Sequence, residues 1–151
     1  MSWGSSFQSS GFVAAVAREV KAHFASRGSE PHTEVRSRLA KFWWGDDRSI
    51  HYELAVHERM LQLEMGLHFE AAADTNRRLY QAFGPHLLEI QEELGDSIWL
   101  EEWDRGWTRI YETEPLLPLD DERTTSVAAR LCELIDCLQP LLEAIEGNEV
   151  R

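Results

Sequence analysis

The chain has 151 residues, of which 43% are hydrophobic and 28% are charged, and its formal net charge is −12. This length suits one domain with a sizeable core, and the composition excludes a disordered or collagen-like chain. Basic residues form no strong patch, so we expect no nucleic-acid binding and no binding to acidic membranes. We predict a single α+β domain over residues 1–151, with flexible ends at residues 1–8 and 147–151.

The first predicted element is an amphipathic helix over residues 10–24. Apolar side chains recur there at helical spacing, and Gly28 can end the helix: Phe12, Val13, Val16, Val20 and Phe24. Residues 34–44 then alternate between two sets of side chains, which predicts a strand. A short helix is the alternative, because it would also place Leu39 and Trp43 together.

Two strongly alternating segments, residues 49–56 and 61–69, predict an antiparallel hairpin with a four-residue connection. Pairing residue 56 with residue 61 places all the apolar side chains on one face: Ile50, Tyr52, Leu54, Val56, Leu61, Leu63, Met65, Leu67 and Phe69. The same register places Glu53 opposite Glu64 on the polar face, with His51 and His68 one or two positions away.

Two helices are predicted in the second half of the chain. The first begins near Asp74 and runs to Leu94, and Gly84-Pro85 should kink it or divide it into two short helices. The second runs from about residue 120 to residue 145, and Pro140 should bend it or end its first part. The predicted order is therefore α-β-ββ-α-ββ-α, an antiparallel sheet of four to five strands with helices packed on one face.

Between these helices, residues 97–112 predict a second hairpin around a three-residue turn at residues 104–106. Its aliphatic residues point toward the helices, and the opposite face receives three cross-strand pairs: Trp103 with Trp107, Glu101 with Arg109, and Trp99 with Tyr111. Trp44 and Phe42 extend this aromatic set if residues 34–44 join the sheet. Large aromatic side chains are rarely left as a contiguous exposed patch, so something is expected to cover this face.

Three kinds of cover are considered for the aromatic face. The N-terminal helix or the link at residues 113–119 could cover it within the monomer, a second copy could form a homodimer, or a ligand or another protein could bind there. The order of elements, the small size and the acidity resemble those of secretion-chaperone-like proteins, which are dimers that bind segments of partner proteins. The leading prediction is a noncatalytic protein-interaction module that forms a homodimer through the aromatic face.

The acidity of the chain is concentrated in one region. Residues 89–122 contain twelve acidic groups against Arg105 and Arg109, which gives 2 − 12 = −10. Such a charge usually serves solubility, and a basic partner is the sharper alternative.

The polar face of the first hairpin suggests a second kind of function. His51, Glu53, Glu64 and His68 could bind a transition metal, or the two carboxylates could serve acid-base catalysis. A third hypothesis is a groove between sheet and helices in which a small molecule stacks against the aromatic residues Trp99, Trp103, Trp107 and Tyr111. Because no GxSxG elbow, glycine-rich phosphate loop or CxxC pair occurs, we expect no cofactor and favour a protein without catalytic activity.

The expected location is the cytoplasm. The start of the chain lacks the features of a secretory signal, and no run of about 18 apolar residues occurs. Cys132 and Cys137 are the two cysteines, and their spacing within one predicted helix does not suit a disulfide. We expect two reduced thiols in or near the core.

Overall fold

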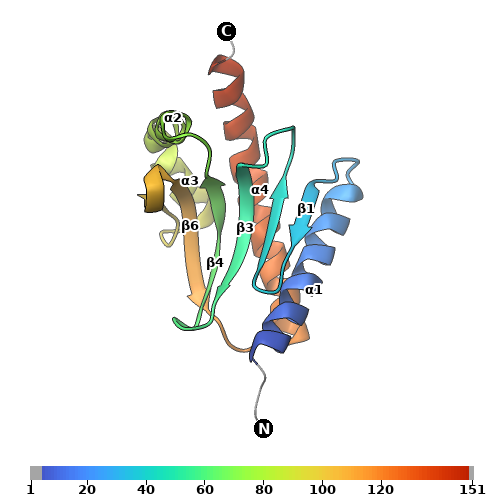
Figure 1. Cartoon of the computed structure of the whole chain (residues 1–151). Coiled ribbons are helices and arrows are strands. Elements are labelled where there is room, and N and C mark those ends of the chain that lie inside the picture. The colour runs from blue at the N-terminus through green and yellow to red at the C-terminus, as the bar shows by residue number, and fades with distance from the viewer. Residues whose placement is uncertain (1–4, 150–151) are drawn as a thin grey trace.

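The protein is described by a computed structural model that covers residues 5–149. A six-stranded antiparallel sheet has the order β1-β2-β3-β4-β6-β5, and Figure 1 shows the long helix α4 running behind it. The strands are β1 (His32–Val35), β2 (Leu39–Trp43), β3 (Ile50–His57), β4 (Gln62–Phe69), β5 (Trp99–Glu102) and β6 (Thr108–Pro115). The helices are α1 (Ser5–Ala25), α2 (Ala73–Phe83), α3 (Leu87–Leu94) and α4 (Asp121–Glu149). The α+β class and the antiparallel sheet are as predicted.

The sheet has one strand more than the largest predicted number. The segment 34–44 was predicted as one strand, but it forms a hairpin in which Glu34 pairs with Lys41 and Val35 with Ala40. The chain reverses between these strands, where the Arg36 amide donates to the Leu39 carbonyl at 2.8 Å. This short turn contains neither glycine nor proline, so the alternation of side chains continued through it without a visible break.

The register of the β3–β4 hairpin differs by two residues from the predicted one. Val56 pairs with Leu63 instead of Leu61, because Leu61 belongs to the turn and has a φ of +53°. A shift of two residues keeps every side chain on its predicted face, since the strand period is two. It does change the cross-strand partners, and Glu53 faces Gly66 instead of Glu64.

The two prolines in the helical segments behave differently. The predicted break at Gly84-Pro85 is confirmed, because a single 3₁₀ turn at Gly84–His86 separates α2 from α3. Pro140 does not end α4, which continues as helix to Glu149. The helices α1 and α4 therefore also include residues 5–8 and 147–149 of the predicted flexible ends, whereas residues 1–4 and 150–151 lie outside the described residues.

The core lies between the helices and one face of the sheet. Buried side chains from α1, α2, α3 and α4 form one cluster with inward residues of the strands, among them Tyr52, Leu67 and Ile110. The Tyr52 hydroxyl also donates to Oε1 of Gln139 in α4 at 2.9 Å. Both cysteines are free thiols in this helical layer, Cys132 buried and Cys137 half-buried. The opposite face of the sheet, called the open face below, carries the candidate sites.

Candidate functional site

The predicted register of the β5–β6 hairpin is confirmed. Trp99 pairs with Tyr111 and Glu101 with Arg109, and the Trp103 amide donates to the Trp107 carbonyl at 2.8 Å across the turn. Side chains alternate along a strand, so the residues at odd positions here share one face. Leu100 and Ile110, at even positions, are buried in the core, so the odd positions belong to the open face.

Four side chains of this hairpin form what we call the aromatic patch: Trp99, Trp103, Trp107 and Tyr111. The indole rings of Trp103 and Trp107 lie 5.7 Å apart between centroids. The Arg109 guanidinium lies 4.6 Å from the Trp103 ring centroid and 4.0 Å from that of Tyr111, in cation–π geometry. Trp99 is 56% exposed and Trp103 is 37% exposed, so the patch presents aromatic surface to solvent.

The structure does not show an internal cover for this patch within residues 5–149. The N-terminal helix α1 packs its apolar side chains, including Val13, Val16 and Val20, into the core on the other face of the sheet. The link after β6 directs Leu116 into the same core, and its amide donates to the Leu61 carbonyl at 2.9 Å. The two segments that were candidates for covering the patch are therefore occupied elsewhere.

Trp44 does not belong to the aromatic patch, contrary to the sequence-based expectation. Its ring contacts Phe24 at 5.2 Å and Tyr52 at 6.1 Å between centroids, and its indole N–H donates to the Ser29 carbonyl at 3.2 Å. Phe42 is fully buried in the same core, because it pairs with the inward residue Tyr52. The predicted small-molecule groove between sheet and helices is also wrong. Its walls were to be the residues of the aromatic patch, and these lie on the open face, away from the helices.

A second group on the open face consists of His51, Glu53, His68 and Glu70, called the His/Glu cluster below. His51 and His68 are cross-strand partners on β3 and β4, and their rings stack with centroids 5.6 Å apart. One potential ligand atom from each of the four residues lies within 4.8 Å of the others. Three of the four residues predicted as metal ligands are therefore brought together.

The fourth predicted ligand, Glu64, has a different place. Its carboxylate accepts hydrogen bonds from His57 at 2.9 Å, from His68 at 2.7 Å and from Arg109 at 2.9 Å. Glu70 takes its position in the cluster, two residues after His68. The alternation along β4 places Glu70 on the same face as His68, so the sequence could have indicated this ligand. It was missed because the predicted strand ended at Phe69, one residue before Glu70.

Two pKa values within this network are strongly displaced. Burial opposes the ionised form of Glu64, but the hydrogen bonds from His57 and His68 outweigh that effect and hold its pKa well below the usual range. Burial likewise lowers the pKa of His68, whereas its hydrogen bonds with Glu64 and Glu70 raise it to about 9. The network joins the His/Glu cluster to the aromatic patch, because Arg109 binds both Glu64 and Glu101.

The open face is closely packed where β4 and β6 meet. Gly66 pairs with Tyr111, and a Cβ atom added to Gly66 would lie 2.7 Å from the Cβ atom of Tyr111. The Tyr111 hydroxyl donates to Oε2 of Glu101 at 2.9 Å. A residue without a side chain at position 66 therefore allows the Tyr111 backbone and ring to lie against β4.

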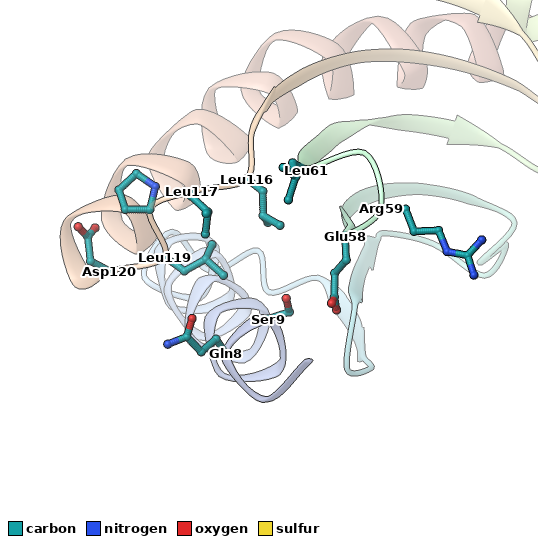
Figure 2. A pocket seen from close by; sticks show the side chains of 10 residues that line it. Gln8, Ser9, Glu58, Arg59, Leu61, Leu116, Leu117, Leu119 and Asp120 are labelled. Carbon is teal, nitrogen blue, oxygen red and sulfur yellow. The ribbon is translucent and has the colours of Figure 1, made fainter. Parts of the chain in front are cut away.

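A separate apolar groove of about 660 Å³ lies at one end of the molecule (Figure 2). Its walls come from the start of α1, the β3–β4 turn and the link before α4. Leu61 and Leu117 line it and remain largely exposed, and Ser9 lies in its α1 wall. The groove has a volume typical of ligand pockets, but it shares no residue with the aromatic patch or the His/Glu cluster.

Comparisons with known proteins give little information about this chain. No family model matches it, and no curated protein matches it. One similar solved structure is the HopA1-SchA chaperone-effector complex, at 14% identity over 88% of this chain and 91% of the matched chain, with a TM-score of 0.38. Another is the ExsC-ExsE complex, at 18% identity over 86% of this chain and 95% of the matched chain, with a TM-score of 0.37. These TM-scores are too low to carry an argument about fold or function.

Among the described residues, no helix is both long enough and apolar enough to cross a membrane.

Proposed function

We propose that this chain is a protein-interaction module that forms a homodimer through the aromatic patch. The observation that supports this proposal is the exposure of Trp99 and Trp103 on a sheet face that the helices leave open. Tryptophan and tyrosine are enriched among the residues that anchor protein interfaces. Covering exposed indole surface also supplies a favourable free energy of burial.

The size of the patch suits an interface between proteins. An aromatic side chain of this kind buries roughly 150 to 250 Å² when it is fully covered. Trp99 and Trp103 keep 56% and 37% of their surface exposed, and Trp107 and Tyr111 are half-buried, so the four residues would form the centre of an interface whose remaining area comes from their neighbours. Arg109 holds two of the rings in fixed positions, and such preorganisation reduces the entropy that association costs.

The charges around the patch favour a second copy as the partner. Arg105 is exposed at the turn beside the patch, and Glu101 lies on the open face of β5, two residues after Trp99. A two-fold interface places the same surface on both sides, so charged groups within it avoid repulsion when both signs are present and each can face the other in the partner. This local mixture can offset the repulsion between two chains that each carry a net charge of −12.

The test is the mass in solution, measured by light scattering coupled to size exclusion over a range of protein concentrations. We expect the wild type to have twice the 17.4 kDa mass of one chain. The Trp99→Glu variant should be a folded monomer, because a carboxylate would be desolvated at the interface. Far-UV circular dichroism of the variant checks that it remains folded.

Leu88→Glu is the matched control, since it places the same carboxylate on another exposed apolar residue. Leu88 is 77% exposed on α3, in the helical layer away from the patch. This variant should remain a dimer. A wild type that stays monomeric at every concentration, or a Trp99→Glu variant that remains dimeric, would overturn the proposal.

A further inference from the structure

We propose that the His/Glu cluster binds one divalent transition-metal ion of the zinc class, held by two imidazole nitrogens and two carboxylates. All four ligands come from one chain, so this site does not depend on dimer formation. Strand alternation explains how it is built: His51 and Glu53 are two residues apart on β3, and His68 and Glu70 are two residues apart at the end of β4. The pairing of His51 with His68 then gathers the four side chains over one spot.

The distances between the ligand atoms suit such an ion. His51 Nε2 lies 3.0 Å from Glu53 Oε1 and 4.0 Å from Glu70 Oε1, and His68 Nδ1 lies 3.0 Å from Glu70 Oε2. Zinc binds nitrogen and carboxylate oxygen at about 2.0 to 2.2 Å in a tetrahedron, which places ligand atoms roughly 3.3 Å apart. The four ligand atoms all lie within 4.8 Å of one another, so side-chain rotations must draw the more distant ones together to complete the tetrahedron.

The outer hydrogen bonds of both histidines leave one nitrogen of each ring for the metal. His51 Nδ1 can donate to the Arg48 carbonyl at 2.9 Å, and His68 Nε2 can donate to Glu64 Oε2 at 2.7 Å. Metal-binding histidines usually donate their second N–H to a carbonyl or carboxylate in this way, which fixes the tautomer and orients the ring. Glu64 is therefore a positioning residue in this proposal.

The hydrogen-bond inventory of the two rings also favours a cation at this place. Each ring has an acceptor oxygen beside both of its nitrogens. A neutral imidazole has a single N–H and can satisfy only one of them. The second carboxylate or carbonyl beside each ring then needs a cation, which is either a proton on the second ring nitrogen or a metal ion shared by the two rings. His51 and His68 are 1% exposed, so solvent cannot take the place of that cation.

The nature of the ligands indicates what the ion would do. Imidazole suits zinc and its first-row neighbours, whereas magnesium and calcium prefer oxygen ligands alone. Four protein ligands leave no position open for a substrate, which is typical of structural zinc sites and not of catalytic ones. His68 also contacts the edge of the Trp103 ring, with centroids 6.0 Å apart. A bound ion would hold the strands that support the aromatic patch.

The experiment begins with protein that has been stripped of metal with a chelator. Titration with Zn²⁺ by calorimetry should give one ion per chain, and Co²⁺ should give the visible absorption of a four-coordinate site. Mg²⁺ should not compete. We expect His51→Ala/His68→Ala to lose this uptake, while the control His32→Ala/His86→Ala, which removes the same number of histidines from other elements, should keep it.

Two further variants protect the test against misfolding and distinguish the roles of the carboxylates. Glu53→Gln/Glu70→Gln keeps the size of two side chains that are only partly buried, and it should lower the affinity by more than 100-fold. Glu64→Gln should weaken binding by about 10- to 100-fold, as removal of an outer partner does. The proposal would be overturned if the wild type takes up neither Zn²⁺ nor Co²⁺, or if uptake persists in both double variants of the cluster. In the first case the cluster would be an ion-pair network with a protonated His68.

Discussion

Each face of the sheet contains one buried carboxylate bound by an arginine, and the two differ in where their partners come from. Glu112 on the covered face accepts from Arg130 of α4 at 2.7 Å to each oxygen, and from Ser97 at 3.1 Å. Glu64 on the open face is bound, among residues 5–149, by residues of β3, β4 and β6 and by no helix. Both carboxylates have side chains that are 3% exposed.

The difference shows two uses of a buried charge. On the covered face, the ion pair joins α4 to the sheet and contributes to the packing of the layers. On the open face, the sheet buries Glu64 under its own side chains, although no described helix lies over it. A surface organised in this way is already in position for a partner or a ligand, which lowers the entropy cost of binding.

The largest expected effect separates the core from the aromatic patch. Leu67→Ala removes a fully buried side chain under the helices and should lower the free energy of unfolding by about 4 kcal/mol. Trp99→Ala removes a larger side chain that is 56% exposed and pairs with Tyr111 across the strands, and it should lower the free energy of unfolding of the monomer by only about 1 kcal/mol. Urea denaturation of both variants, at concentrations below any dimer formation, measures the two values.

A large loss of monomer stability in Trp99→Ala would contradict the distinction between the faces. It would mean that the aromatic patch contributes to folding, and the case for an interface would weaken. The size of the Leu67→Ala effect depends on how far the core collapses around the cavity. The difference between the two variants is therefore a better test of the distinction between the faces than either value alone.

The second expected effect compares the two ion pairs directly. Arg130→Met should cost about 3 kcal/mol, because it leaves the buried Glu112 carboxylate with Ser97 as its one remaining side-chain partner among those observed. Arg109→Met should cost less, about 2 kcal/mol, since Glu64 keeps its hydrogen bonds with His57 and His68. Urea denaturation at neutral pH tests this order.

Adding Glu112→Gln to Arg130→Met should recover part of the loss, because the unpaired charge is removed. The same addition of Glu64→Gln to Arg109→Met should recover less. A larger loss for Arg109→Met than for Arg130→Met would show that the open face, and not the contact with α4, contains the more important ion pair.

The sequence predicted the faces of the strands better than their partners. Alternation alone assigned His51, Glu53 and His68 to one face, and this assignment survived a register error of two residues. The register depends on the geometry of the turn, and in this turn Leu61 has a positive φ. Leucine rarely adopts that conformation, so the sequence did not indicate where the turn lies. By contrast, the second hairpin has Gly106 in its turn with a φ of +77°, and its register was predicted correctly.

The parts of the site that the sequence did not predict depend on contacts between distant segments. Trp44 follows a strand whose neighbour was unknown, so its face could not be assigned until Phe42 was seen to pair with Tyr52. The role of Glu64 required three partners from three strands. No pattern along one strand contains that information.

The smallest expected effect tests how tightly the open face is packed. Gly66→Ala places a methyl group against the backbone carbonyl oxygen of Ile110 and 2.7 Å from Tyr111 Cβ, closer than these atoms can approach, and the backbone of β6 must move. We expect a loss of about 1 to 2 kcal/mol, in the range of overpacked sites. Gly11→Ala is the matched control, because an added Cβ at this exposed position of α1 meets nothing within 4 Å.

The control should move in the opposite direction, since alanine favours a helix over glycine by up to about 1 kcal/mol. Thermal and urea denaturation of the two variants therefore give changes of opposite sign for the same substitution. If Gly66→Ala were as stable as the wild type, β4 and β6 would have room to separate at Tyr111. The proposal that Arg109 holds the rings of the aromatic patch in fixed positions on a closely packed sheet would then be wrong, even if every hydrogen bond of the network were present.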